Sequence, residues 1–157
     1  MPHRLYHWRV RIEAALGEYQ AVRIALDMLG DATVEEIHEL TDERDWEDLV
    51  AADIYAAERN LEATYLIRMY SVFERAIASY WRQLPGNQDR QVDGDVMLGE
   101  VGHVEMDEGV IASAQAVRAH RNKLVHRRID DHAGDMTVKD ASRLLLAYLE
   151  SLPATWG

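Results

Sequence analysis

Cationic and histidine side chains gather between residues 118 and 128 of a chain that is otherwise acidic. The protein has a formal net charge of −11 at pH 7, yet no Asp or Glu occurs between Gly109 and Ile129. Such a concentration of positive charge attracts an anionic ligand. Guanidinium groups bind phosphate oxygens and histidine moves protons near neutral pH, and RNA cleavage requires both tasks. The basic and imidazole residues of this segment are Arg118, His120, Arg121, Lys123, His126, Arg127 and Arg128.

The same segment has the residue spacing of a helix. Its apolar residues recur at helical intervals, as Val110, Ala114, Val117 and Leu124. Arg121 falls near the centre of this apolar stripe, where an aliphatic side chain is expected. Because arginine is rarely buried without a partner, Arg121 needs either a ligand or a structural partner. Arg121 and His126 point about 140° apart on an ideal helix, so the long arginine side chain or a distortion of the helix end must bring them together.

The sequence Arg121-Asn122-Lys123-Leu124-Val125-His126 resembles the Arg-polar-x-x-x-His motif of HEPN domains. These are small all-α domains, many of which are metal-independent endoribonucleases that act as toxins or defence effectors. The flanking segments resemble the family as well, since a helix that contains Tyr70 to Arg75 precedes the motif and a final helix from Val138 to Leu152 follows it. The resemblance covers about residues 51–153.

The resemblance implies an endoribonuclease that cleaves single-stranded RNA by attack of the 2′-hydroxyl on the adjacent phosphate. In that reaction a base removes the hydroxyl proton, an acid protonates the leaving 5′ oxygen, and cations stabilise the developing charge. His126 is the candidate base or acid, Arg121 holds the scissile phosphate, Asn122 fixes the imidazole or contacts the phosphate, and Glu74 orients Arg121. No metal or other cofactor is expected. The candidate RNA contacts are Lys123, Arg127, Arg128, Arg118 and His120.

A homodimer is also implied by the resemblance. One motif supplies one histidine, whereas two proton transfers are needed, and HEPN protomers pack with their motifs facing one shared cleft. The expected setting is a toxin–antitoxin pair or antiviral defence, with an antitoxin such as a nucleotidyltransferase as the candidate partner. Many such toxins carry a tyrosine two residues after the histidine, where the antitoxin modifies it. This chain has Arg128 there, so regulation through that tyrosine does not carry over.

Each of these roles has a structural alternative. Arg121 would form an ion pair with a core carboxylate such as Glu74 or Glu62, and His126 would stabilise the helix C-terminus as a cation. The other basic residues would form a solvated face, and Glu74 would pair with Arg75 or Arg68. Two alternative functions follow, a catalytically silent HEPN module that binds RNA or a partner protein, and an unrelated helical bundle.

Two pairs of residues have the spacing of di-iron ligands. Glu35 with His38 and Glu100 with His103 are each three residues apart, but di-iron bundles need such a pair on two helices together with further glutamates. Gly99 and Gly102 flank the second pair and disfavour a helix there. Because the chain is rich in acidic residues, such pairs arise readily by chance, and no metal site is expected.

Length and composition place the chain among globular proteins of one domain. Its 157 residues suit a single core. The absence of cysteine fits a reducing cytoplasm, and neither an apolar run of membrane length nor the apolar core of a signal peptide is present. The net acidity argues against a general nucleic-acid coat but leaves room for a local site. We therefore expect a cytoplasmic protein with no membrane segment.

Helical patterns dominate the chain. They predict a helix from Arg4 to Leu29, a short capped helix from Val34 to Leu40, and a core helix over Trp46–Leu84, either continuous or broken near Arg59-Asn60. The polar stretch Gln88–Asp107 is expected to hold only a short helical turn near Val96 to Leu98. Asp107 is expected to cap a motif helix that ends at about Arg128, and Thr137 with Asp140 to open the last helix.

These elements predict an all-α fold, an antiparallel HEPN-like bundle of four to five helices. The expected organisation is one domain over residues 1–157. Its HEPN-like core spans about residues 51–153, and the N-terminal helices over residues 4–41 pack on that core.

Overall fold

The computed structural model describes residues 3–31, 51–88, 90–102, 106–126 and 136–156, with only the backbone described at positions 3, 51–55 and 59. The helix predicted over Val34–Leu40 and the expected start of the core helix at Trp46 lie outside the described residues. So do Glu35, His38 and His103 of the two pairs with di-iron spacing.

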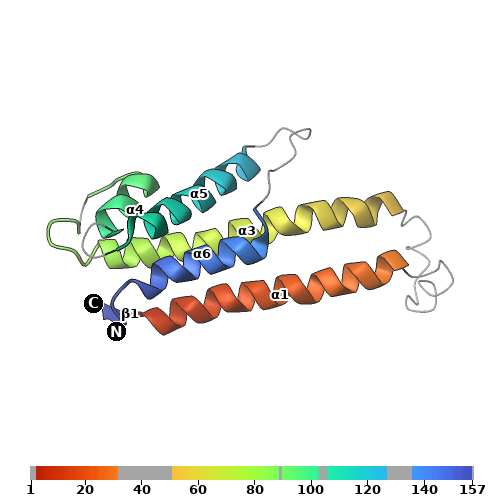
Figure 1. Ribbon diagram of the computed structural model, residues 1–157, viewed down its shortest axis with the longest axis horizontal. Coiled ribbons are helices and arrows are strands. Elements are labelled where there is room, and N and C mark those ends of the chain that lie inside the picture. Colours follow the sequence, from red (N-terminus) through yellow and green to blue (C-terminus); the bar gives the residue numbers. More distant parts are fainter. Residues whose placement is uncertain (1–2, 32–50, 89, 103–105, 127–135, 157) are drawn as a thin grey trace.

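The described chain is an all-α antiparallel bundle, as predicted (Figure 1). Helices α3 and α6 lie between α1 on one side and α5 on the other, and α4 packs on α3 and α5. In the described part of the chain, no helix has the length and apolar content needed to span a membrane. The helices are α1 (Leu5–Asp31), α3 (Ala51–Trp81), α4 (Gly94–Gly102), α5 (Glu108–Val125) and α6 (Val138–Glu150).

Helix α3 forms the centre of the core. It runs without interruption through Arg59-Asn60, so the break considered near those residues does not occur. Its apolar stripe is buried as the spacing predicts. The turn after α3 includes Gly86 with a φ of 85°, a conformation that favours glycine. The buried side chains of the stripe are Leu66, Met69, Tyr70, Phe73, Ile77 and Trp81.

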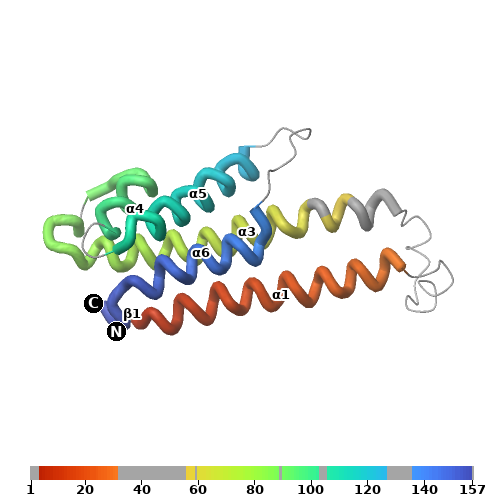
Figure 2. The backbone as a smooth tube through the Cα atoms, in the orientation of Figure 1, coloured from red at the N-terminus to blue at the C-terminus, as the bar shows by residue number. Residues whose placement is uncertain are grey.

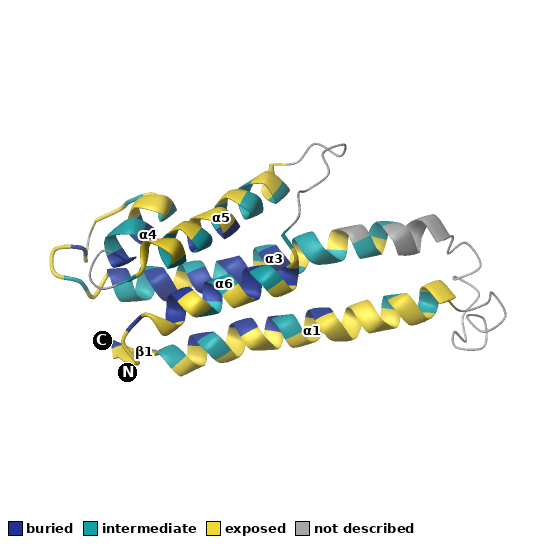
Figure 3. Cartoon of the chain, in the orientation of Figure 1, coloured by how far each residue is buried: buried dark blue, intermediate teal, exposed yellow. Residues whose placement is uncertain are grey.

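Helix α1 packs one face on α3 and α6 and leaves its opposite face in solvent (Figure 3). Trp8, Ile12, Ala15 and Tyr19 form the buried face. Gly17 lies in the middle of the helix and is exposed. A Cβ atom added there would meet no other atom within 4 Å, although glycine inside a helix costs about 1 kcal/mol relative to alanine. The contacts of the described residues therefore do not explain why position 17 is glycine.

Helix α4 is longer than the single turn that the sequence predicts. It spans nine residues and includes Gly99 and Gly102, so the expectation that these glycines disfavour a helix is wrong. Packing explains the difference, because Met97, Leu98 and Val101 are buried in the core and such burial overrides weak helix propensity. Gly102 also makes room for its neighbour, since a Cβ there would lie 2.4 Å from Ile111 Cδ1.

The predicted caps hold α5 and α6 in place. Asp107 caps α5 and its carboxylate accepts a 2.8 Å hydrogen bond from the Gly109 amide. Helix α5 ends at Val125 rather than at about Arg128, with His126 as its C-cap. Thr137 caps α6 and accepts a 3.1 Å hydrogen bond from the Asp140 amide.

A short β ribbon joins the two ends of the described chain. Strand β1 (His3–Arg4) pairs antiparallel with β2 (Thr155–Trp156), with His3 opposite Trp156. The Leu5 amide donates a further 3.1 Å hydrogen bond to the Ala154 carbonyl. The chain ends therefore lie side by side at one end of the bundle (Figure 2).

Candidate functional site

Helix α5 places Arg121 at its contact with α3. Val117, one turn earlier, is fully buried, and Arg121 itself is half-buried, as its position on the apolar stripe predicts. The guanidinium Cζ atom lies 5.7 Å from the centre of the Tyr70 ring, within the range of a cation–π contact. Its Nη1 donates a 3.0 Å hydrogen bond to Asn122 Oδ1. The Nε atom is buried and has no hydrogen-bond partner among the described residues.

No carboxylate neutralises Arg121 in the described part of the chain. Glu62, one of the two candidate partners, instead accepts a 2.8 Å hydrogen bond from the Tyr19 hydroxyl and lies 3.5 Å from Arg23. Glu74, the other candidate, forms no ion pair with Arg121 among the described residues. The guanidinium is therefore partly removed from water and held by an amide and an aromatic ring rather than by an anion.

The aromatic ring of Tyr70 is the surface on which the Arg121 guanidinium packs. Its side chain is almost fully buried, and this burial is the main cause that raises the pKa of Tyr70 to about 12. The Glu74 carboxylate adds to the increase in pKa, while the positive charges of Arg118 and Arg121 oppose it. The phenol is therefore neutral at physiological pH, and it offers Arg121 a ring face rather than a counter-charge.

Two further charged side chains, Glu74 of α3 and Arg118 of α5, meet at Gly94 at the start of α4. A Cβ added to Gly94 would lie 3.1 Å from Arg118 Nε and 3.6 Å from Glu74 Oε1, so both polar atoms sit against this glycine. Arg118 also pairs with Asp95 at 3.5 Å. We call Tyr70, Glu74, Asp95, Arg118, Arg121 and Asn122 the Arg121 cluster.

Glu74 therefore lies beside Arg118. Among the described residues it forms no ion pair with Arg75 or with Arg68, which pairs with Glu18. Arg118 already has a carboxylate partner in Asp95. For that reason Arg118 offers less free charge to a phosphate than Arg121 does.

The remaining residues of the basic segment spread around and beyond the end of α5. His126 is exposed, and its backbone amide donates a 3.1 Å hydrogen bond to the Asn122 carbonyl. No hydrogen bond joins the side chains of Arg121 and His126 in the described part of the chain. Lys123 is exposed and His120 is half-buried on the same helix. Arg127 and Arg128 lie outside the described residues.

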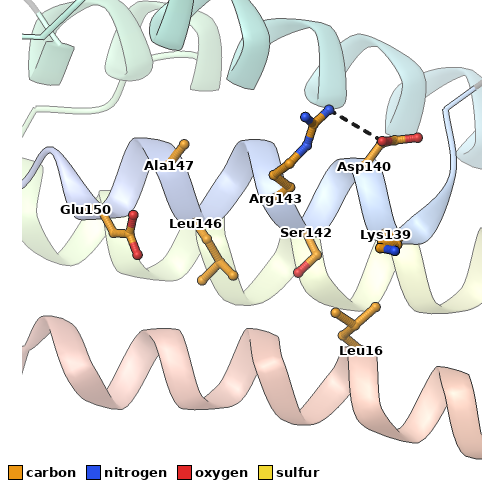
Figure 4. Close-up of a pocket in the computed structure, with 8 residues that line it drawn as sticks. All are labelled: Leu16, Lys139, Asp140, Ser142, Arg143, Leu146, Ala147 and Glu150. Atoms are coloured by element: carbon orange, nitrogen blue, oxygen red, sulfur yellow. Dashed lines mark hydrogen bonds and ion pairs between the residues drawn. The ribbon is translucent and has the colours of Figure 1, made fainter.

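A groove of about 660 Å³ runs along α6, on the side next to α1 (Figure 4). Its walls include Leu16 and Leu146, with Arg143 paired to Asp140 at 3.4 Å on its edge. The groove contains none of the residues that the sequence predicts to be catalytic or to contact RNA. Its shape is open and its lining is largely apolar, whereas the Arg121 cluster has the cationic chemistry that a phosphate needs. We therefore take the Arg121 cluster, and not this groove, as the candidate site.

Glu100 has a structural role in the described chain. It accepts a 3.0 Å hydrogen bond from Trp81 Nε1 and pairs with Arg90 at 2.8 Å. These contacts lower the pKa of its carboxyl, with the Trp81 hydrogen bond as the largest cause. Glu100 thus connects α4 to the end of α3 and to the segment between these two helices.

Two members of the Arg121 cluster were not expected from the sequence. Tyr70 belongs to the apolar stripe of α3, and its spacing predicts an ordinary core residue. The one available signal is that Tyr70 precedes Glu74 by four residues, which places both on one side of the helix. Asp95 lies in a segment whose sequence predicts a loop. Its ion pair with Arg118 depends on the packing of α4 on α5, which the local sequence does not indicate.

Comparisons with known proteins do not extend this assignment. No model of a known protein family matches the chain, and no match was found among curated proteins or among solved structures. The candidate site therefore rests on the motif and on the contacts of Arg121.

Proposed function

We propose that the protein is a metal-independent endoribonuclease of the HEPN type that cleaves single-stranded RNA. The observation that carries the proposal is the state of Arg121, a half-buried guanidinium with no carboxylate partner in the described chain. Placing a cation in this way is unfavourable unless an anion completes the site. Protein side chains that break local rules in this manner are typical of functional sites.

In the proposed reaction the RNA supplies its own nucleophile. The 2′-oxygen forms a bond to phosphorus and the bond from phosphorus to the 5′ oxygen breaks, which gives a 2′,3′-cyclic phosphate and a free 5′-hydroxyl. His126 takes the proton from the 2′-hydroxyl or gives one to the leaving oxygen. Arg121 holds the non-bridging phosphate oxygens with a charge-assisted fork. Asn122 keeps the guanidinium in one orientation through its 3.0 Å hydrogen bond.

The second proton transfer calls for a second histidine, which we assign to the motif of a second protomer. In this arrangement the exposed His126 of each chain faces a cleft shared with its partner, so Arg121 and His126 of one chain need not meet. Lys123, Arg127, Arg128 and His120 are the further residues that we assign to RNA binding. A toxin–antitoxin pair or a defence system in the cytoplasm, with an antitoxin as protein partner, is the setting that suits such an enzyme.

A catalytically silent HEPN module that binds RNA or a partner protein is the second candidate. Two observations favour it. Among the described residues no hydrogen bond joins the side chains of Arg121 and His126, and the Asn122 amide oxygen already accepts a hydrogen bond from Arg121. A silent module keeps the cationic surface but cleaves nothing.

Cleavage assays separate these candidates. The purified chain is incubated in EDTA with labelled single-stranded RNA and with a copy of that RNA in which each 2′-hydroxyl is removed. We expect cleavage of the first only, with cyclic-phosphate ends. His126→Ala and Arg121→Lys should each abolish cleavage, whereas the exposed controls His7→Ala and Arg143→Lys should not. Cutting of the deoxy substrate, or full activity in His126→Ala, would show that the proposed mechanism is wrong.

A further inference from the structure

The outer face of α1 carries an apolar stripe that nothing in the described chain covers. Its members are three or four residues apart and fall within an arc of about 80° on a helix, which is the pattern of a helix–helix seam. No charged side chain of α1 falls within this arc. Four large members are exposed, with Tyr6 at 68%, Val10 at 39%, Ile24 at 60% and Met28 at 69%. The full set, which we call the outer stripe, is Tyr6, Val10, Ala14, Gly17, Ala21, Ile24 and Met28.

The outer stripe lies almost opposite the buried face of α1. That buried face packs on α3 and α6, and the outer edge of α1 is exposed along the helix (Figure 3). A helix with two apolar faces can make two contacts, and the described part of the chain supplies a partner for only one of them. The stripe is about 33 Å long from Tyr6 to Met28, which is long enough for a continuous helix pair.

The sizes of these side chains are symmetric about Gly17. Large residues occupy both ends of the stripe and the small residues Ala14, Gly17 and Ala21 occupy its middle. Tyr6 and Met28 are equally far from Gly17, and Val10 and Ile24 are equally far from it as well. An antiparallel copy of the same helix would therefore place Tyr6 against the partner's Met28 and Val10 against the partner's Ile24. Self-complementarity of this kind is the requirement of a twofold interface.

Gly17 supports the same arrangement. It is unfavourable in a helix, and none of the described residues of its own chain needs the space that its missing side chain leaves. At the centre of an antiparallel pair, however, two facing glycines let the helices approach closely, because the distance between helix axes depends on the side chains at the contact.

We propose that a second copy of this chain packs antiparallel against the outer stripe of α1, with the twofold axis at Gly17. The charges beside the stripe suit this pairing. Arg9 and Asp27 lie on the same flank near opposite ends of the helix. An antiparallel partner therefore brings Arg9, which pairs within its own chain with Glu13 and Glu150, near Asp27 of the other copy. Glu18 lies closest to the axis, and Arg68 already neutralises it.

This contact is independent of the proposed ribonuclease site. Helices α3 and α6 lie between α1 and α5 (Figure 1), so the outer stripe and the Arg121 cluster are on different sides of the bundle. A pair joined through α1 does not form the shared cleft of two motifs. The chain then has two separate self-association faces if both proposals hold, and either proposal can fail without the other.

Equilibrium sedimentation of the full chain tests the proposal. We expect the wild-type chain to show a monomer–dimer equilibrium, and Ile24→Glu to raise its dissociation constant at least roughly tenfold, because a carboxylate would be buried against the partner's Val10. Val22→Glu is the matched control. Val22 is an exposed aliphatic residue of the same helix, but it points about 120° away from the centre of the stripe, so the dissociation constant should be unchanged.

A strictly monomeric wild type would overturn the proposal. So would equal dissociation of the two variants, or an Ile24→Glu dimer as tight as the wild type, since the association would then use another face. Circular dichroism melts of both variants check that the monomer remains folded.

Cysteine cross-linking tests the axis and does not depend on the glutamate variants. The chain has no cysteine, so Gly17→Cys introduces a single thiol at a position with open space for a side chain. We expect oxidation to convert Gly17→Cys to a covalent dimer. Ile24→Cys should not cross-link to itself, because the two thiols would be about 21 Å apart along the helices. Self-linking of Ile24→Cys together with no linking of Gly17→Cys would contradict the antiparallel arrangement.

Discussion

Replacing Arg121 by methionine separates a functional arginine from a structural one. Methionine has a similar length and no charge, so Arg121→Met keeps packing on Tyr70 while it removes the guanidinium. A structural arginine is needed for stability, whereas a ligand-binding arginine without a counter-ion is tolerated at a cost to the fold. The two cases predict different changes in the free energy of unfolding, a loss of more than about 3 kcal/mol for a structural arginine and little change for a ligand-binding one.

The contacts of Arg121 give the size of the expected change. The substitution loses the contact with the Tyr70 ring, worth about 0.5–1 kcal/mol, and the hydrogen bond to Asn122, worth about 1.5 kcal/mol for a charged donor. It also removes the buried Nε that has no partner, which relieves about 1–3 kcal/mol. These terms nearly cancel. We expect the unfolding free energy of Arg121→Met to lie within about 1 kcal/mol of the wild-type value, a change in Tm of roughly 2–4 °C at most for a chain of this length.

Urea denaturation and RNA cleavage are measured on the same preparations. We expect Arg121→Met to unfold at nearly the wild-type midpoint and to have lost cleavage activity. Arg118→Met is the matched control, because it removes an arginine on the same helix that does have a carboxylate partner. Destabilisation of Arg121→Met by more than about 3 kcal/mol, the cost of breaking a buried ion pair, would refute the reasoning and favour a structural role.

Three further predictions concern the fold that holds the site. The pKa of Tyr70 is raised to about 12 in the folded chain, so its contribution to stability is complete below pH 10. It should fall by about 1.4 kcal/mol per pH unit as the pH rises from 10 to 12, because only the unfolded phenol ionises there. The free energy of unfolding of the wild type should therefore fall relative to that of Tyr70→Phe across this range in urea denaturation, and parallel curves would contradict the assignment. Gly102→Ala should destabilise the chain by about 1–3 kcal/mol through overpacking, and Ile111→Val in the same chain should restore part of the loss in a thermal melt. Thr137→Ala should cost about 1 kcal/mol by removing the cap of α6, measured by urea denaturation, whereas Thr137→Ser should cost little.

The sequence alone predicts the helices that have long apolar stripes and clear caps. The α3 stripe from Leu66 to Trp81 is buried as its spacing requires, and Asp107 and Thr137 cap α5 and α6 as expected. These features depend on local chemistry, which one segment of sequence contains. The half-buried position of Arg121 follows from the same periodicity.

Features that depend on contacts between distant segments were not predictable in this way. Gly99 and Gly102 indicate a loop by local preference, but the packing of α4 on α3 and α5 makes them helical. The pairing of Arg118 with Asp95 follows from that packing. The HEPN-like arrangement and the role of His126 stay predictions, because among the described residues only the backbone amide of His126, and not its imidazole, bonds to a member of the Arg121 cluster.

The short β ribbon at the chain ends has a consequence for engineering. His3–Arg4 and Thr155–Trp156 already lie side by side, so a short peptide between the two ends would close the backbone into a ring without moving a helix. The unfolded ring would have far less freedom than the unfolded linear chain. The loss of loop-closure entropy from the unfolded chain should raise the free energy of unfolding by about 5 kcal/mol for a loop of more than 100 residues. Cyclised protein would also permit new ends to be opened elsewhere in the chain, each at a chosen distance from Arg121.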